Sequence, residues 1–348
     1  MLSWIDSVFA TPAEKTHAIG RRALKNLITH NKEHSFLLAQ SIEMWYIADT
    51  PMALESYIDV VVRILIESEE VTVPFYKILG ACLFILGNEN HGLRIKSAKL
   101  LRTLEERQGK NSKLQDLDIS VSDKTAAIYK LAHFECSSRL AKQHSELAFY
   151  IFSDFSYYFK GMKADQQRSM IAAMLPWVQT IELQLDPNGG PAAPSYMILV
   201  NLVELTISYG TILHNEISAL WQALATGPYG GNVQLVLDFI ISLCLDRREQ
   251  NFVPFAKQII VHLASTPAGL KVIEFLLLHI TPKAMVQEKK ESGSVPPEIA
   301  AFPYSADLSA VLPTGNKQVR FSTICLGRTT NVYKVRIFIR TNLPHIAS

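Results

Sequence analysis

The sequence predicts an all-α protein, namely an α-solenoid of HEAT/armadillo-like helical hairpins with an irregular C-terminal extension. Two observations favour this fold class. Apolar residues recur at three- and four-residue spacing up to about residue 280, as in Leu93, Ala98, Leu101 and Leu104, and this spacing places them on one face of an α-helix. Proline and glycine interrupt the periodicity at short intervals, where an array of helical hairpins needs its turns.

The periodic segments can be assigned one after another. They predict helices at 16–30, 34–48, 52–68, 74–86, 92–107, 122–140, 141–160, 165–183, 195–209, 214–225, 232–245, 251–264 and 268–280. The breakers at or near the junctions are Pro51, Pro74, Gly92, Gly161, Gly210, Pro228 and Pro267. Thr50-Pro51 is an N-cap residue followed by proline in the first turn, the favoured order at a helix start. Paired, these helices give units of roughly 35–45 residues, the length of HEAT and armadillo repeats.

The stretch 86–104, LGNENHGLRIKSAKLLRTL, shows how one such unit is built. Asn88 or Asn90 can cap the helix that follows the polar turn. We expect Ala98 to be small because two helices approach closely there, and we expect Arg94 to bridge to the turn of the neighbouring unit.

We divide the chain into three parts. Residues 1–280 form the HEAT/armadillo-like repeat region, and 281–318 form a linker or loosely ordered extension, because that segment bears proline and serine and lacks periodicity. Residues 319–348 form the third part. From Tyr333 to Ile339, apolar residues occupy every second position, which predicts a short β-hairpin tail, an atypical ending for a helical array.

Composition narrows the class of protein. The net charge of the 348-residue chain is +2, so nothing draws it to nucleic acid. Its four cysteines lie far apart in the sequence, and their spacing matches no zinc-binding or disulfide pattern. This fits buried thiols in a reducing compartment. The longest apolar run, 78–87, is too short to cross a bilayer. We therefore expect a cytoplasmic protein without an integral membrane segment and without a cofactor.

One stretch of the sequence matches a catalytic motif. His30 to His34 spell HxxEH, the zinc pattern of inverted metalloproteases, in which both histidines share a continuous helix and Glu33 is the base. Here the surrounding sequence reads as a helix end, a polar turn and a new helix start, and no third ligand is identifiable. We predict that the protein is not an enzyme, with a zinc hydrolase as the alternative.

Four residues are candidates for binding a protein partner. Tyr157 and Tyr158 belong to the segment FYIFSDFSYYFK, in which the six rings from Tyr150 to Phe159 wrap most of a helix and cannot all face one core. Tyr229 lies in the glycine-rich loop TGPYGGN, and Arg94 lies at the start of its helix. Exposed loops of a solenoid often make contacts.

The stretch MLPWVQTIELQLDPN at 174–188 resembles the central region of the Furry-type cell-morphogenesis proteins. The resemblance continues through the segments 194–227, 232–245 and 251–264. It implies a non-catalytic HEAT/armadillo-like scaffold that supports an NDR-type serine/threonine kinase and its Mob coactivator in polarised growth and cell shape. It also implies a location at the cell cortex or at sites of polarised growth. Another α-solenoid adaptor or transport factor, with different cargo, is the second interpretation.

Overall fold

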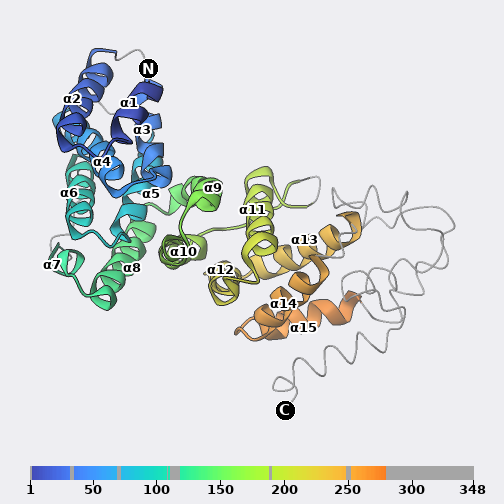
Figure 1. The fold of residues 1–348 in the computed structure, drawn as a ribbon. Coiled ribbons are helices and arrows are strands. Elements are labelled where there is room, and N and C mark those ends of the chain that lie inside the picture. Colours follow the sequence, from blue (N-terminus) through green and yellow to red (C-terminus); the bar gives the residue numbers. More distant parts are fainter. Residues whose placement is uncertain are drawn as a thin grey trace. The chain divides into compact units, whose positions relative to one another are not determined.

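The protein is all-helical in the parts that the structure describes, and those residues hold no named β-strand (Figure 1). The structure is a computed structural model, and it describes residues 2–31, 35–68, 72–107, 109, 118–187, 190–247 and 252–279. The predicted segments 281–318 and 319–348 lie outside the described residues. Among the described helices, none combines the length and the apolar character that a membrane crossing requires.

The helices occur in the following order along the chain. They are α1 (Leu2–Phe9), α2 (Glu14–His30), α3 (Ser35–Ile47), α4 (Pro51–Glu67), α5 (Phe75–Leu86), α6 (His91–Arg107), α7 (Asp118–Ser122), α8 (Ala126–Gln143), α9 (Ala148–Tyr158), α10 (Ala164–Gln179), α11 (Ala193–Tyr209), α12 (His214–Thr226), α13 (Asn232–Arg247), α14 (Phe252–Ala264) and α15 (Gly269–His279). Short 3₁₀ turns, η2 (Ser145–Leu147) and η3 (Phe159–Gly161), flank α9.

The predicted helices are all present, and the differences are local. The expected helix 141–160 is interrupted, because the chain leaves the α-helix at His144 and passes through η2 before α9 begins. Two short helices, α1 and α7, were not expected. The close approach of α5 and α6 occurs at Ser97, whose buried Oγ donates to the Cys82 carbonyl at 3.0 Å, whereas Ala98 is half-buried. The expectation for Ala98 was therefore one residue off.

The chain divides into two compact units, Met1–Trp177 and a second that begins at Val178. In the first unit, α4 packs against α2 and α6, and α5 packs against α3 and α9, so the helices form two layers (Figure 1). Helix α5 is buried from Ile78 to Leu86 on every side, as expected for a helix that is apolar all round. It is the centre of this unit.

The second unit is built from α11 to α15 and from the segment that precedes them. The side chain of Asn232, at the start of α13, is 1% exposed and holds the segment around 181–183 by hydrogen bonds. Its amide nitrogen donates to the carbonyls of Ile181 and Leu224 at 2.8 and 3.0 Å, and its oxygen accepts from the amide of Leu183 at 2.9 Å. One side chain thus satisfies three backbone groups at the start of α13.

Candidate protein-binding surface

The α3–α5–α9 layer of the first unit carries a concentration of tyrosines. We call this surface the tyrosine face, and its rings are Tyr46 of α3, Tyr76 of α5, and Tyr150, Tyr157 and Tyr158 of α9. Three helices that are distant in the sequence contribute to it. As expected, the rings of α9 and of the turn that follows it do not all face the core. Phe152, Phe155 and Phe159 are buried, whereas Tyr150 and Tyr157 are 56% and 79% exposed.

The rings of the tyrosine face contact one another in ordered pairs. Tyr46 and Tyr158 stack in parallel with ring centroids 4.4 Å apart, and Tyr157 meets the edge of Tyr158 at 4.9 Å. Tyr76 and Tyr150 stack at 5.2 Å. Gly80 of α5 leaves room for this arrangement, because a Cβ there would lie 3.3 Å from the Tyr46 hydroxyl. Aromatic pairs of this kind are rigid, so little entropy is lost when a partner covers them.

A charged cluster lies within the tyrosine face and consists of Glu43, Lys77 and Asp154. The Lys77 ammonium donates to Glu43 Oε1 at 3.2 Å. Burial lowers the pKa of Lys77, but the hydrogen bond to Glu43 and the charge of Asp154 outweigh it and leave that pKa raised. Burial also raises the pKa of Asp154, with Lys77 opposing the rise and Glu43 adding to it. Two carboxylates therefore share one cation.

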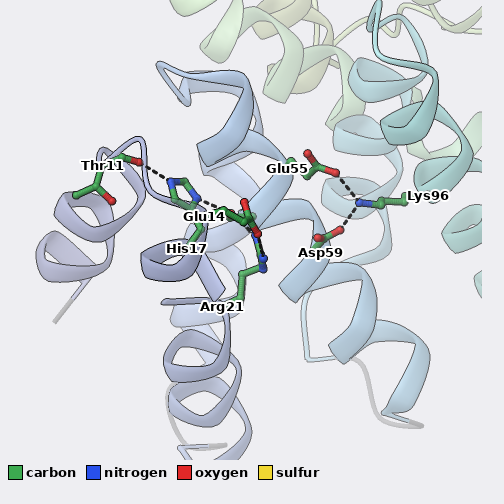
Figure 2. Close-up of polar contacts among 8 residues, drawn as sticks. Thr11, Glu14, His17, Arg21, Glu55, Asp59 and Lys96 are labelled. Atoms are coloured by element: carbon green, nitrogen blue, oxygen red, sulfur yellow. Dashed lines mark hydrogen bonds and ion pairs between the residues drawn. The ribbon is translucent and has the colours of Figure 1, made fainter. Parts of the chain in front are cut away.

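The α2–α4–α6 layer has a different chemistry, because ion pairs join its helices to one another. Lys96 of α6 donates to Glu55 at 3.0 Å and to Asp59, both on α4 (Figure 2). Lys25 of α2 pairs with Glu67 of α4 at 2.5 Å. Ion pairs exposed to water contribute little stability, and the layer also carries exposed charges at Arg22, Arg63 and Lys99.

A second polar network joins α2 to α4 and is also drawn in Figure 2. Because a carbonyl can only accept, His17 Nε2 donates to the Thr11 oxygen at 2.7 Å. His17 Nδ1 lies 2.8 Å from the Ser56 hydroxyl, which accepts from Arg21 at 3.1 Å. Arg21 also pairs with Glu14. His17 and Ser56 are both fully buried, so this network is a structural connection between helices.

Arg94 has an internal position. It is 0% exposed, and its guanidinium donates to the carbonyls of Asn88 and Glu89 in the α5–α6 turn and of Val121 and Asp123 at the end of α7. Its Cζ lies 3.9 Å from the centroid of the Tyr129 ring. The expected bridge to the next turn is thus present. A partner could reach this side chain only if the turn opened.

Arg107, at the end of α6, caps a different helix. Its guanidinium donates to the carbonyls of Leu65, Ser68 and Ile66 at 2.6–2.8 Å, where α4 ends. Helix C-termini leave their last carbonyls unpaired and carry partial negative charge. The sequence alone gives no sign of this role, because an arginine in the last turn of a helix is expected to interact with the carbonyls of its own helix.

The second unit contains Tyr229, the fourth candidate residue. Tyr229 is half-buried in the turn before α13, and its carbonyl accepts from the Asn232 amide at 3.1 Å. The adjoining groove between α13 and α15 has a volume of about 270 Å³. It is lined by Gly230, Val233, Gln234, Leu237, Lys271, Glu274, Phe275 and Leu278. The structure thus pairs Tyr157 with Tyr158 but places Arg94 in the other layer. A binding role for the four residues stays a prediction.

The structure also locates the groups considered for catalysis. Helix α2 ends at His30, and Asn31 is non-helical with φ −115° and ψ 57°; Glu33 and His34 lie outside the described residues. Burial raises the pKa of Cys82 and of Cys136 to about 12, which suits packed thiols. Within the described part of the chain, no group of three or more His, Cys, Asp or Glu side chains could hold a metal ion.

These features define a helical protein whose exposed chemistry is a surface of rings and charges. Residues 11–288 match the family described as "Cell morphogenesis central region", and the chain belongs to this family. It is 25% identical over 324 residues to the cell polarity protein mor2 of Schizosaccharomyces pombe and 24% identical over 329 residues to the cell morphogenesis protein PAG1 of Saccharomyces cerevisiae.

Each alignment covers 92% of this chain but only 15% of mor2 and 14% of PAG1. The chain thus spans about one seventh of the length of these relatives. The predicted resemblance to Furry-type cell-morphogenesis proteins is confirmed. No solved structure matches the chain.

Proposed function

We propose that this chain is a segment of a non-catalytic α-solenoid scaffold that acts in cell morphogenesis and binds protein partners through the tyrosine face. The layered contacts of the first unit support the solenoid. In the consecutive hairpins α3–α4 and α5–α6, the first helices of the two hairpins pack together, and so do the second helices, as in stacked HEAT or armadillo units. We further propose that residues 1–280 are one such repeat region.

The observation that carries the binding role is the exposure of Tyr157 and Tyr150 beside a charged cluster. Tyrosine is among the residues that dominate binding energy at interfaces, because it combines a large apolar ring with a polar tip. In the opposite layer of the same unit, ion pairs of Lys25 and Lys96 join the helices, and no tyrosine cluster of this kind is found among its described residues. The two layers therefore differ in what they offer a partner.

The partners that we propose are an NDR-type serine/threonine kinase and its Mob coactivator, at the cell cortex or at sites of polarised growth. The support is family membership together with the names of the relatives, which are proteins of cell polarity and cell morphogenesis. Holding two partners on one surface raises their effective concentration for each other, which is how a protein without catalytic groups promotes a signalling reaction.

The test is a binding measurement with the full chain immobilised and the kinase–Mob complex in solution. The double substitution Tyr150→Ala and Tyr157→Ala should weaken binding at least tenfold, since ring truncation at an interface centre has effects of this size. Lys99→Ala, at an exposed position of α6 in the other layer, is the control and should leave binding unchanged. Equal binding by the double variant and the wild type, with circular dichroism unchanged, would refute the role of the tyrosine face.

A further inference from the structure

Asp154 is the one member of the charged cluster whose carboxylate accepts no hydrogen bond from the described residues. Lys77 interacts with it through charge, but the lysine hydrogen bond goes to Glu43. The Asp154 side chain is only half-buried, so an incoming group can reach it. The cluster thus contains two carboxyl groups and a single ammonium group.

The surroundings of Asp154 are aromatic on both sides along the helix. Tyr150, Asp154 and Tyr157 occupy positions i, i+4 and i+7 of α9, so they share one face of that helix. The rise of about 1.5 Å per residue places each ring roughly one turn from the carboxylate. Tyr157, the most exposed of these rings, presents a free surface beside it.

We propose that the tyrosine face binds an arginine side chain from a basic segment of a protein partner, with the guanidinium against the ring of Tyr157 and its N–H groups donating to the Asp154 carboxylate. This inference rests on the proposed function of the tyrosine face and adds the chemistry of the partner. It places a cation where the fold leaves a carboxylate without a donor.

The chemistry favours arginine over the other cation and over an apolar segment. A guanidinium is planar, stacks on aromatic rings, and donates through a fork that matches a carboxylate. An ammonium is a compact and strongly hydrated point charge, so it loses more hydration on entering a half-buried site. An apolar segment would cover Asp154 without giving it a donor, and an acidic segment would be repelled.

The probes are fluorescein-labelled nona-arginine and nona-lysine peptides, titrated with the full chain and followed by fluorescence anisotropy at 150 mM salt. The test variant is Asp154→Asn, and the matched control is Asp165→Asn, which removes the same charge from a carboxylate of α10 that is 85% exposed. The amide has the shape of the carboxylate, and Asp154 accepts no hydrogen bond from the described residues, so this substitution should not disturb the fold.

The wild type should bind the arginine peptide several-fold more tightly than the lysine peptide. Asp154→Asn should weaken arginine binding about tenfold and remove most of that preference, as expected for loss of a charged partner. Asp165→Asn should stay within about twofold, since exposed charges are largely screened at this salt. Equal losses for the two variants, or equal affinity for the two peptides, would overturn the proposal.

Two further outcomes separate this inference from the proposed function. If Tyr150→Ala/Tyr157→Ala loses the kinase–Mob complex but Asp154→Asn binds that complex normally, the tyrosine face is an interface and the arginine site is wrong. If the peptide results hold but the kinase–Mob complex does not bind, the arginine site stands and those partners are wrong. Sedimentation velocity tests a second copy of the chain as the occupant, and a change in self-association upon Asp154→Asn would overturn the proposed partner.

Discussion

Replacing Arg94 with alanine should destabilise the first unit more than almost any other single substitution. The side chain is fully buried and donates to four carbonyls in two different turns. Burial lowers the pKa of Arg94, whereas the Tyr129 ring and the charge of Asp123 raise it. The guanidinium is therefore held by its contacts against the cost of leaving water.

The magnitude follows from how far each carbonyl is buried. The bond to the Val121 carbonyl, at 2.7 Å, is buried and should contribute about 2 kcal/mol, as hydrogen bonds to charged groups do. The other three carbonyls are partly exposed, so water replaces much of the guanidinium there. The contact with Tyr129 adds about 1 kcal/mol. We expect Arg94→Ala to cost about 3–5 kcal/mol in the free energy of unfolding.

The assay is urea unfolding of the full chain followed by circular dichroism, with hydrogen exchange at residues 118–123 as the local measurement. Arg94→Lys keeps the charge but cannot reach all four carbonyls, so it should fall between wild type and Arg94→Ala. Lys99→Ala, on the same helix and exposed, should stay within about 0.5 kcal/mol. A loss below about 1 kcal/mol for Arg94→Ala, with unchanged exchange in α7, would refute this account of the clamp.

Three more predictions test buried polar groups. Asn232→Ala leaves three buried backbone groups unpaired and should cost about 3 kcal/mol in urea unfolding, against less than about 0.5 kcal/mol for the exposed Asn215→Ala. Burial raises the pKa of Asp238 from 3.8 to about 6, so the folded protein favours the protonated carboxyl group. The stability that this protonated group contributes is fully present below pH 3.8 and is lost as the pH rises through 6. Asp238→Asn should match the wild type at pH 4 and exceed it by about 1–2 kcal/mol at pH 7.5, and a constant difference across pH would contradict this. Neither carboxylate oxygen of the buried Glu105 accepts a hydrogen bond from the residues that the structure describes, and Oε1 lies 3.7 Å from His144 Nε2. Glu105→Gln should be neutral or stabilising in thermal unfolding, whereas His144→Leu, which removes the polar ring beside the buried carboxylate, should cost about 3 kcal/mol.

The positions of the helices were predictable because their breakers are local. Proline and glycine mark most junctions, and the apolar spacing between them repeats often enough to fix the period. The short helices were missed because they lack that repetition. Of the α1 residues whose burial the structure describes, 3–9, Ile5 and Phe9 are buried, which is a single i, i+4 pair, and the five-residue α7 is shorter than two turns.

The candidate site was predictable only in part, because its members meet through tertiary packing. The sequence of α9 indicates that its rings must point in two directions. Nothing in that segment shows that Tyr158 stacks on Tyr46, or that Lys77 interacts with both Glu43 and Asp154. Arg94 shows the same limit. A charged residue next to a polar turn is expected to be exposed, and its burial becomes evident only when the fold brings the carbonyls of a distant turn against it.

The capping of α4 by Arg107 has a mechanical consequence. One guanidinium holds three carbonyls, so a force that pulls the end of α4 away from α6 must break all three bonds almost together. That junction would bear load up to a threshold and then fail abruptly. The two acidic partners of Lys96 sit on successive turns of α4, so its ammonium can exchange one for the other as the helices slide. Stretching would thus meet a stiff connection at one end of α6 and a yielding one near the other.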